Sequence, residues 1–178
     1  TSSTNKQSNL QSAMRIFSQI SPTNSLYAPA MGRIGDCYLQ LGVGNPQFYD
    51  LASNAYTQVT SLPDADVATR SQAKIGLGIV AEKLAQLRTG TEQTGLLVMA
   101  FNDYNDVFLY DILRGKEKPD PFWTKRAGLA AAATAESLGY WVQAINIYQR
   151  MEQLAPPLQP MLEKKIVAAR KNLEGTPD

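Results

Sequence analysis

The 178-residue sequence predicts an all-α fold of about eight helices stacked as helical hairpins. Ten prolines divide the chain into segments of helical length, in which apolar residues recur at i, i+3, i+4 and i+7. One pattern of small, aromatic and apolar residues also occurs four times. No segment shows a sustained period of two, and the chain contains no Asn-Gly or Asp-Gly hairpin turn.

The predicted helices follow one another along the whole chain. Proline is tolerated in loops and first helical turns but breaks helix interiors, so the boundaries are placed around the prolines. In chain order the helices are expected near residues 5–20, 27–42, 46–61, 65–88, 92–114, 121–138, 140–155 and 158–174. This helical content far exceeds the usual proportion of about one third, so it needs support from internal repetition.

The recurring pattern is an alanine, an aromatic residue four positions later and an apolar residue three positions after that. It occurs at Ala13, Phe17 and Ile20; at Ala52, Tyr56 and Val59; at Ala100, Tyr104 and Val107; and at Ala144, Tyr148 and Met151. The small residue permits close approach of a neighbouring helix, and the aromatic residue fills the space between two helices. Helices with this frame, here termed second-type, alternate with first-type helices that lack it.

Two stretches resemble tetratricopeptide repeats. Residues 28–42, APAMGRIGDCYLQLG, are similar to the first helix of that repeat, W-x2-L-G-x2-Y. Met31 stands in place of Trp, Ile34 in place of Leu, and Gly42 is expected to end the helix in a left-handed conformation. The second helix of the repeat is matched by Gly139, Trp141, Ala144, Tyr148, Met151 and Pro156.

The resemblance implies a right-handed α-solenoid of stacked antiparallel helix hairpins (TPR-like), forming a single domain over residues 1–178. The period exceeds the roughly 34 residues of the family. Helix 65–88 can be registered on Gly76-Leu77 or on Leu77-Gly78, and both registers remain open. Lys165 stands where the repeat carries Leu, which is typical of a capping helix. A segment cut from a longer array is the alternative.

Composition excludes several kinds of chemistry. The chain has no histidine, which removes catalytic triads and zinc sites built on that residue, and it has no phosphate-binding loop. We therefore expect no enzyme activity, cofactor or metal site. The net charge of +1 argues against a nucleic-acid partner, and no apolar run is long enough for direct membrane insertion. The lone cysteine, Cys37, is predicted to lie in the core.

Other short motifs are interpreted as segments of helices. The GxGxxA match at residues 76–81 lacks a preceding strand, so two glycines at a close helix contact are favoured over nucleotide binding. Residues 102–106 look superficially like the start of a calcium loop, but Phe108 and Arg114 stand where that loop needs Gly and Glu. The basic cluster on the last helix is interpreted as a solvated face. Tyr104 is predicted to lie in the core, with Phe108 or Tyr110 as candidates for a small exposed apolar patch.

The predicted function is a non-enzymatic scaffold that binds a partner protein or peptide in a concave groove lined by first-type helices. The candidate groove residues are Arg33, Asp36, Gln40, Glu82, Lys83, Arg126 and Glu136. The family's clamp for a terminal carboxylate, a cluster of Lys, Arg and Asn, is absent, so that ligand is not predicted. Mutating Arg33 and Asp36 together is expected to weaken partner binding without unfolding the chain.

Resemblance to tetratricopeptide proteins of bacterial envelopes implies a periplasmic or outer-membrane-tethered location, with a cytoplasmic location left open. It rests on the GDCYLQLG and YDLASNAYTQV stretches. The alternative function is a structural or oligomerisation segment of a larger protein. That segment would self-associate through its unpaired terminal helices.

Overall fold

A computed structural model describes residues 2–175, and the fold is all-helical, with no strand among these residues. The helices are α1 (Ser2–Phe17), α2 (Tyr27–Gly42), α3 (Gln47–Ser61), α4 (Val67–Ala85), α5 (Gly90–Phe108), α6 (Pro121–Ser137), α7 (Trp141–Leu154) and α8 (Gln159–Glu174), with a short 3-10 helix at Pro156–Leu158. The all-α prediction is confirmed. Within the described segment of the chain, no helix combines the length and apolarity required to cross a membrane.

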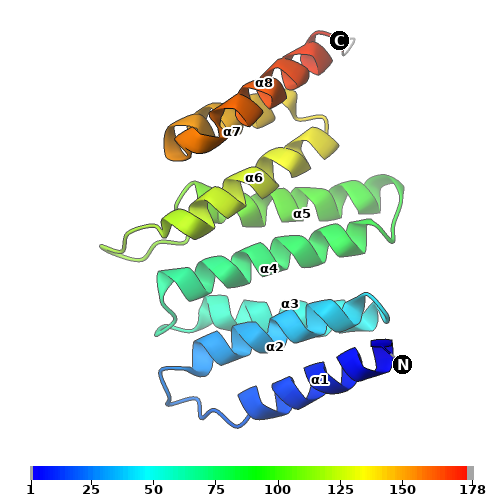
Figure 1. The fold of residues 1–178 in the computed structure, drawn as a ribbon, viewed down its shortest axis with the longest axis vertical. Helices are drawn as coiled ribbons and strands as arrows, with labels where there is room; N and C mark the ends of the chain where they lie inside the picture. The colour runs from blue at the N-terminus through cyan, green and yellow to red at the C-terminus, as the bar shows by residue number, and fades with distance from the viewer. Residues whose placement is uncertain (1, 176–178) are drawn as a thin grey trace.

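The helices lie in two layers along one long axis. The chain advances from α1 at one end to α8 at the other, and each helix packs against the next in sequence (Figure 1). The helices α2, α4 and α6 lie nearer the viewer, with α3 and α5 behind them (Figure 1). The first-type helices α2 and α4 also contact each other, as do α4 and α6. These three helices form one continuous face, here termed the α2–α4–α6 face.

The recurring frame supplies the core of the second-type helices. In α3, α5 and α7 its alanine, aromatic and apolar residues are all only 0–3% exposed. Burying such aromatic rings is a major stabilising contribution. In α1 the same frame is half-buried, and Ile20 lies beyond the end of the helix at Phe17. Helix α1 lies at the end of the stack and packs mainly against α2, so its frame has fewer neighbours than the frames inside the stack.

Helix α4 packs between two core clusters. Its Ala73 and Val80 belong to the cluster around α3, whereas Ile75 and Ala81 belong to the cluster that continues through α5 to α8. A Cβ added to Gly78 would collide with the Tyr104 ring of α5. A Cβ added to Gly35 would likewise collide with the Tyr56 ring within the α2–α3 hairpin. The Leu77-Gly78 register therefore matches Ile34-Gly35.

Gly76, the alternative register position, has its own packing role. A Cβ at Gly35 would lie 2.6 Å from Cε1 of Tyr56, and a Cβ at Gly76 would lie 2.5 Å from Cζ of the same ring. The Tyr56 ring therefore occupies space that the two glycines leave between α2 and α4. Both glycines are needed for packing, which is why the sequence allowed two registers. Gly78 makes room for Tyr104 in its own hairpin, and Gly76 makes room for Tyr56 in the neighbouring hairpin.

The prediction of a left-handed residue at Gly42 is wrong. Gly42 is the last residue of α2, it is absent from the residues with positive φ, and a Cβ there would collide with the Tyr49 ring. Close packing, and not a left-handed turn, explains the glycine. The left-handed stop lies instead at Gly139 after α6, where φ is 72° and the Tyr140 amide donates to the Ala135 carbonyl at 2.9 Å.

Helix α5 ends at Phe108, well before the predicted position 114. Tyr110 adopts a positive φ of 73°, and the Arg150 guanidinium lies 5.0 Å from the ring centroids of both Phe108 and Tyr110. The prediction of a small exposed apolar patch at Phe108 or Tyr110 is also wrong, because Phe108 is fully buried and Tyr110 is half-buried. The helical pattern thus ends where the aromatic rings of Phe108 and Tyr110 contact Arg150 of α7.

The connection from α5 to α6 is fastened to the α3–α4 turn. The Arg114 guanidinium donates to the carbonyls of Thr60, Leu62 and Pro63 at 2.8–3.1 Å. The buried Arg70 side chain donates to the Ile112 carbonyl and forms an ion pair with Glu117. Two arginines therefore hold the segment that leads into α6 and so help to fix where α6 begins.

Candidate functional site

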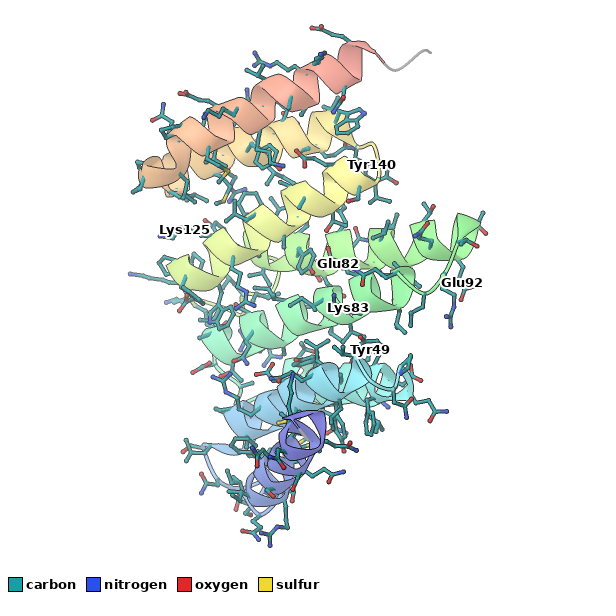
Figure 2. All side chains as sticks on the ribbon, turned by 45° about the vertical axis from the view of Figure 1, so that its right-hand side comes forward. Tyr49, Glu82, Lys83, Glu92, Lys125 and Tyr140 are labelled. Atoms are coloured by element: carbon teal, nitrogen blue, oxygen red, sulfur yellow. The ribbon has the colours of Figure 1, made fainter. Side chains whose placement is uncertain are left out.

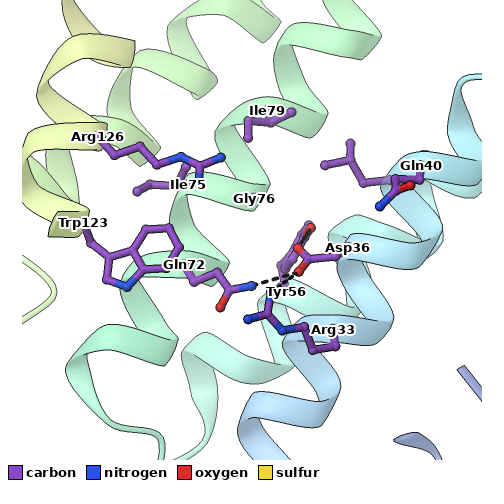
Figure 3. Close-up of a pocket in the computed structure, with 11 residues that line it drawn as sticks. Arg33, Asp36, Gln40, Tyr56, Gln72, Ile75, Gly76, Ile79, Trp123 and Arg126 are labelled. Atoms are coloured by element: carbon purple, nitrogen blue, oxygen red, sulfur yellow. Dashed lines mark hydrogen bonds and ion pairs between the residues drawn. The ribbon is translucent and has the colours of Figure 1, made fainter. Parts of the chain in front are cut away.

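A pocket of about 250 Å³ lies on the α2–α4–α6 face. Four of the seven predicted groove residues line it, although they come from two helices far apart in sequence: Arg33, Asp36 and Gln40 from α2, and Arg126 from α6 (Figure 3). Gln72, Ile75 and Ile79 of α4 and Trp123 of α6 complete much of the wall. The structure therefore brings together more than half of the predicted set. Glu82, Lys83 and Glu136 lie outside this pocket.

Asp36 is the centre of a hydrogen-bonded cluster at the pocket wall. The Tyr56 hydroxyl donates to Oδ1 at 2.7 Å, while Gln72 Nε2 and Arg33 Nη1 donate to Oδ2 at 2.9 and 3.0 Å (Figure 3). The Asp36 side chain is 32% exposed, so these partners replace some of its hydration. One carboxylate thus joins α2 to both α3 and α4.

Glu82 has the same role in the next hairpin. The Tyr104 hydroxyl of α5 donates to Oε2 at 3.0 Å, and the Thr134 hydroxyl of α6 donates to Oε1 at 2.8 Å. Figure 2 shows Glu82 near the middle of the stack, where α4, α5 and α6 meet. Both carboxylate oxygens therefore have partners from the next two helices.

Glu136 of α6 forms the third cluster of this kind. Lys165 of α8 donates to Glu136 Oε2 at 3.0 Å. Burial, followed by the charge and hydrogen bond of Glu136, raises the pKa of the Tyr148 hydroxyl. Burial and a neighbouring carboxylate likewise raise the pKa of Tyr56 and of Tyr104. Each cluster thus joins an acid on a first-type helix to a tyrosine of its hairpin and to a donor on the next first-type helix.

These clusters change what the predicted groove residues offer to a partner. Both carboxylate oxygens of Asp36 and of Glu82 accept hydrogen bonds from within the protein, and Oε2 of Glu136 accepts one from Lys165. Arg33, Gln40 and Arg126 are exposed at the pocket, whereas Lys83 is half-buried and donates to Gln86. The first-type helices carry both signs of charge, but the groups with free hydrogen-bonding capacity at the pocket are mainly donors.

The first turn of α6 adds two aromatic side chains that the sequence analysis did not single out. Asp120 caps the helix by accepting from the Phe122 and Trp123 amides at 2.9 and 3.0 Å, and Pro121 occupies the first turn. Phe122 is 61% exposed and meets the Trp123 ring edge to face at 4.9 Å. The Arg126 guanidinium lies 5.4 Å from the centroid of the Trp123 ring. An aromatic pair directly after an Asp-Pro cap was the available signal.

The other chemical candidates have structural roles. Cys37 is buried, and desolvation followed by the Asp36 charge raises the pKa of its thiol, which keeps it protonated. The GxGxxA match lies wholly inside α4, so it lacks the strand-to-helix turn that cradles a dinucleotide. Among the described residues, no group of three or more Cys, Asp and Glu side chains could hold a metal ion.

Comparison with known proteins adds no relative. A scan against models of protein families, a search of curated proteins and a search of solved structures all find no match to this chain. The chain's own residues are therefore the basis for assigning a role to the α2–α4–α6 face. Its strongest internal regularity is the tyrosine–carboxylate pair, which occurs in three successive hairpins.

Proposed function

We propose that the protein is a non-enzymatic, tetratricopeptide-like scaffold that binds a segment of a partner protein on the α2–α4–α6 face. In this proposal the hairpins stack as a right-handed solenoid. The observation that carries it is the convergence of exposed Arg33, Gln40 and Arg126 around one pocket beside Trp123. Tryptophan and arginine are enriched among the residues that dominate binding energy at protein interfaces.

A rigid base supports this proposal. Asp36 and Glu82 tie the helices under the pocket to one another through hydrogen bonds of 2.7–3.0 Å. A surface whose side chains are already ordered loses less conformational entropy when a partner binds. The hydrogen-bonded acids therefore contribute to binding indirectly, by holding the exposed donors in place.

Peptide selection followed by paired substitutions tests the function. Peptides from a random displayed library would be selected on the wild-type chain, and their affinities measured on two truncation variants. Phe122→Ala removes an exposed ring that lies against Trp123 of the pocket wall, whereas the control Val142→Ala removes a side chain that is 51% exposed on α7. We expect Phe122→Ala to weaken binding at least tenfold, with melting unchanged. Equal affinities for the two variants would sink the assignment of this face.

A second candidate function, a structural segment that self-associates, rests on the two terminal helices. The frame on α1 is half-buried, in contrast to the same frame in α3, α5 and α7. At the other end, α8 exposes Val167 by 68% and Met161 by 40%. Light scattering coupled to size exclusion tests this candidate, because a monomer at every concentration would count against it.

A further inference from the structure

We infer that the partner segment places an aspartate or glutamate carboxylate in the pocket between Arg33 and Arg126, next to an apolar residue that packs on Phe122. This inference rests on the proposed function, because it names the chemistry of the partner that the same face binds. Figure 3 shows the two guanidinium groups on α2 and α6, with α4 between them.

The charges of the pocket lead to this assignment. Its ionisable lining residues are Arg33, Asp36 and Arg126 together with the Tyr56 hydroxyl. Asp36 already accepts three hydrogen bonds, one of them from the tyrosine. Arg126 takes part in none of the ion pairs found among residues 2–175. The pocket therefore carries a net positive charge, and Arg126 lacks an anionic partner among these residues.

The guanidinium of Arg126 is also oriented before a partner arrives. Its position over the Trp123 ring restricts the long side chain through a cation–π contact. A guanidinium carries five N–H donors in a planar fork that matches the two oxygens of a carboxylate. Arg33 uses Nη1 on Asp36 and keeps its other donors, and its side chain is 58% exposed.

Size and lining favour one side chain over a larger ligand. The volume of about 250 Å³ is below the roughly 300–1,000 Å³ of sites for drug-sized molecules. Leu39, Ile75 and Ile79 provide apolar contacts for the methylene stem of an acidic residue. The exposed Phe122 ring lies against Trp123, so a neighbouring apolar residue of the partner can cover it.

Matched peptides and matched variants test the inference on the full chain. The probe is a fluorescein-labelled peptide selected on the wild type, compared with the same peptide in which the acidic residue is replaced by its amide. We expect the amide peptide to bind at least tenfold more weakly, and Arg126→Gln to weaken only the acidic peptide. Arg33→Gln should act in the same direction. The control Arg170→Gln makes the same charge change at an exposed position on α8 and should leave both affinities unchanged.

The possible results separate the inference from the proposed function. Selected peptides that depend on Phe122 but bind equally well as acid and amide would overturn the inference and leave the function standing. Peptides insensitive to Phe122→Ala, or a library that yields no binder, would overturn both. Acidic peptides whose affinity falls with Phe122→Ala, with Arg126→Gln and with added salt would support both.

Discussion

Replacing Gly76 by alanine is a direct test of how α4 packs against α3. The added Cβ would lie 2.5 Å from Cζ of Tyr56, a distance at which something must move. The ring is fully buried, it also packs closely on Gly35, and its hydroxyl is fixed on Asp36. The ring therefore cannot move aside without losing contacts elsewhere.

The expected magnitude follows from two opposing effects. Alanine gains up to about 1 kcal/mol over glycine in a helix interior. Overpacking a close-packed core costs about 1–3 kcal/mol. Gly95 lies in α5 with no atom within 4 Å of an added Cβ, so Gly95→Ala experiences only the gain. The two variants should therefore differ by about 1–3 kcal/mol in free energy of unfolding, or about 2–12 °C in melting temperature for a chain of this size.

The assay compares thermal and urea unfolding of the wild type and both variants, monitored by circular dichroism and tryptophan fluorescence. We expect Gly95→Ala to be at least as stable as the wild type and Gly76→Ala to be the least stable of the three. If Gly76→Ala were as stable as Gly95→Ala, the Tyr56 ring would not be confined between α2 and α4, and the explanation of the α4 register would fail.

Two further predictions concern the ionisable groups. Tyr104→Phe should lower the free energy of unfolding by about 1.5–3 kcal/mol in urea denaturation, because it removes a hydrogen bond to the charged Glu82. Because the pKa of Tyr104 is raised in the folded state, its hydroxyl stabilises the wild type fully below the unfolded value of 10.0 and less as pH rises above it. The difference in stability between the wild type and Tyr104→Phe should therefore shrink in alkali. Glu117→Gln should be less stable than the wild type at neutral pH. Because hydrogen bonds from Arg70 and then the Arg114 amide lower the pKa of Glu117, the two proteins should converge as pH falls below 4.5; a constant difference would contradict this role.

Helical periodicity predicted most of the fold because it reports on burial. The predicted helix at 27–42 coincides with α2, and the Ala-x3-aromatic frame marked the cores of α3, α5 and α7. The end of α5 was not predictable in this way. Residues 109–113 continue a helical pattern, but Tyr110 has a positive φ and its ring lies against Arg150 of α7. Such a contact between distant segments leaves no mark on local periodicity.

The candidate site was only partly predictable. The first-type helices α2, α4 and α6 do form one face, and α2 and α6 supply Arg33 and Arg126 to the same pocket. The sequence did not show that Asp36 and Glu82 are engaged by tyrosines and by the next helix, because those pairings depend on the stacking of successive hairpins. An Arg33 and Asp36 double variant would therefore disturb packing as well as binding. Arg33→Gln together with Arg126→Gln separates the two effects.

The hydrogen-bonded acids explain why mixed charges on this face need not indicate a mixed-charge partner. A carboxylate whose oxygens accept from Tyr104 and Thr134 has little capacity left for another donor. An exposed guanidinium without an anionic partner retains its full capacity. Counting charges along the first-type helices therefore misjudges the surface unless the internal partners are known.

Hydrogen–deuterium exchange of the chain with and without a selected peptide tests the central claim most directly. We predict added protection in α2, in α4 and in the first turn of α6 around Trp123, with little change in α3, α5 and α7. Protection confined to α3, α5 and α7, or to α1 and α8, would contradict the assignment of the α2–α4–α6 face as the binding surface.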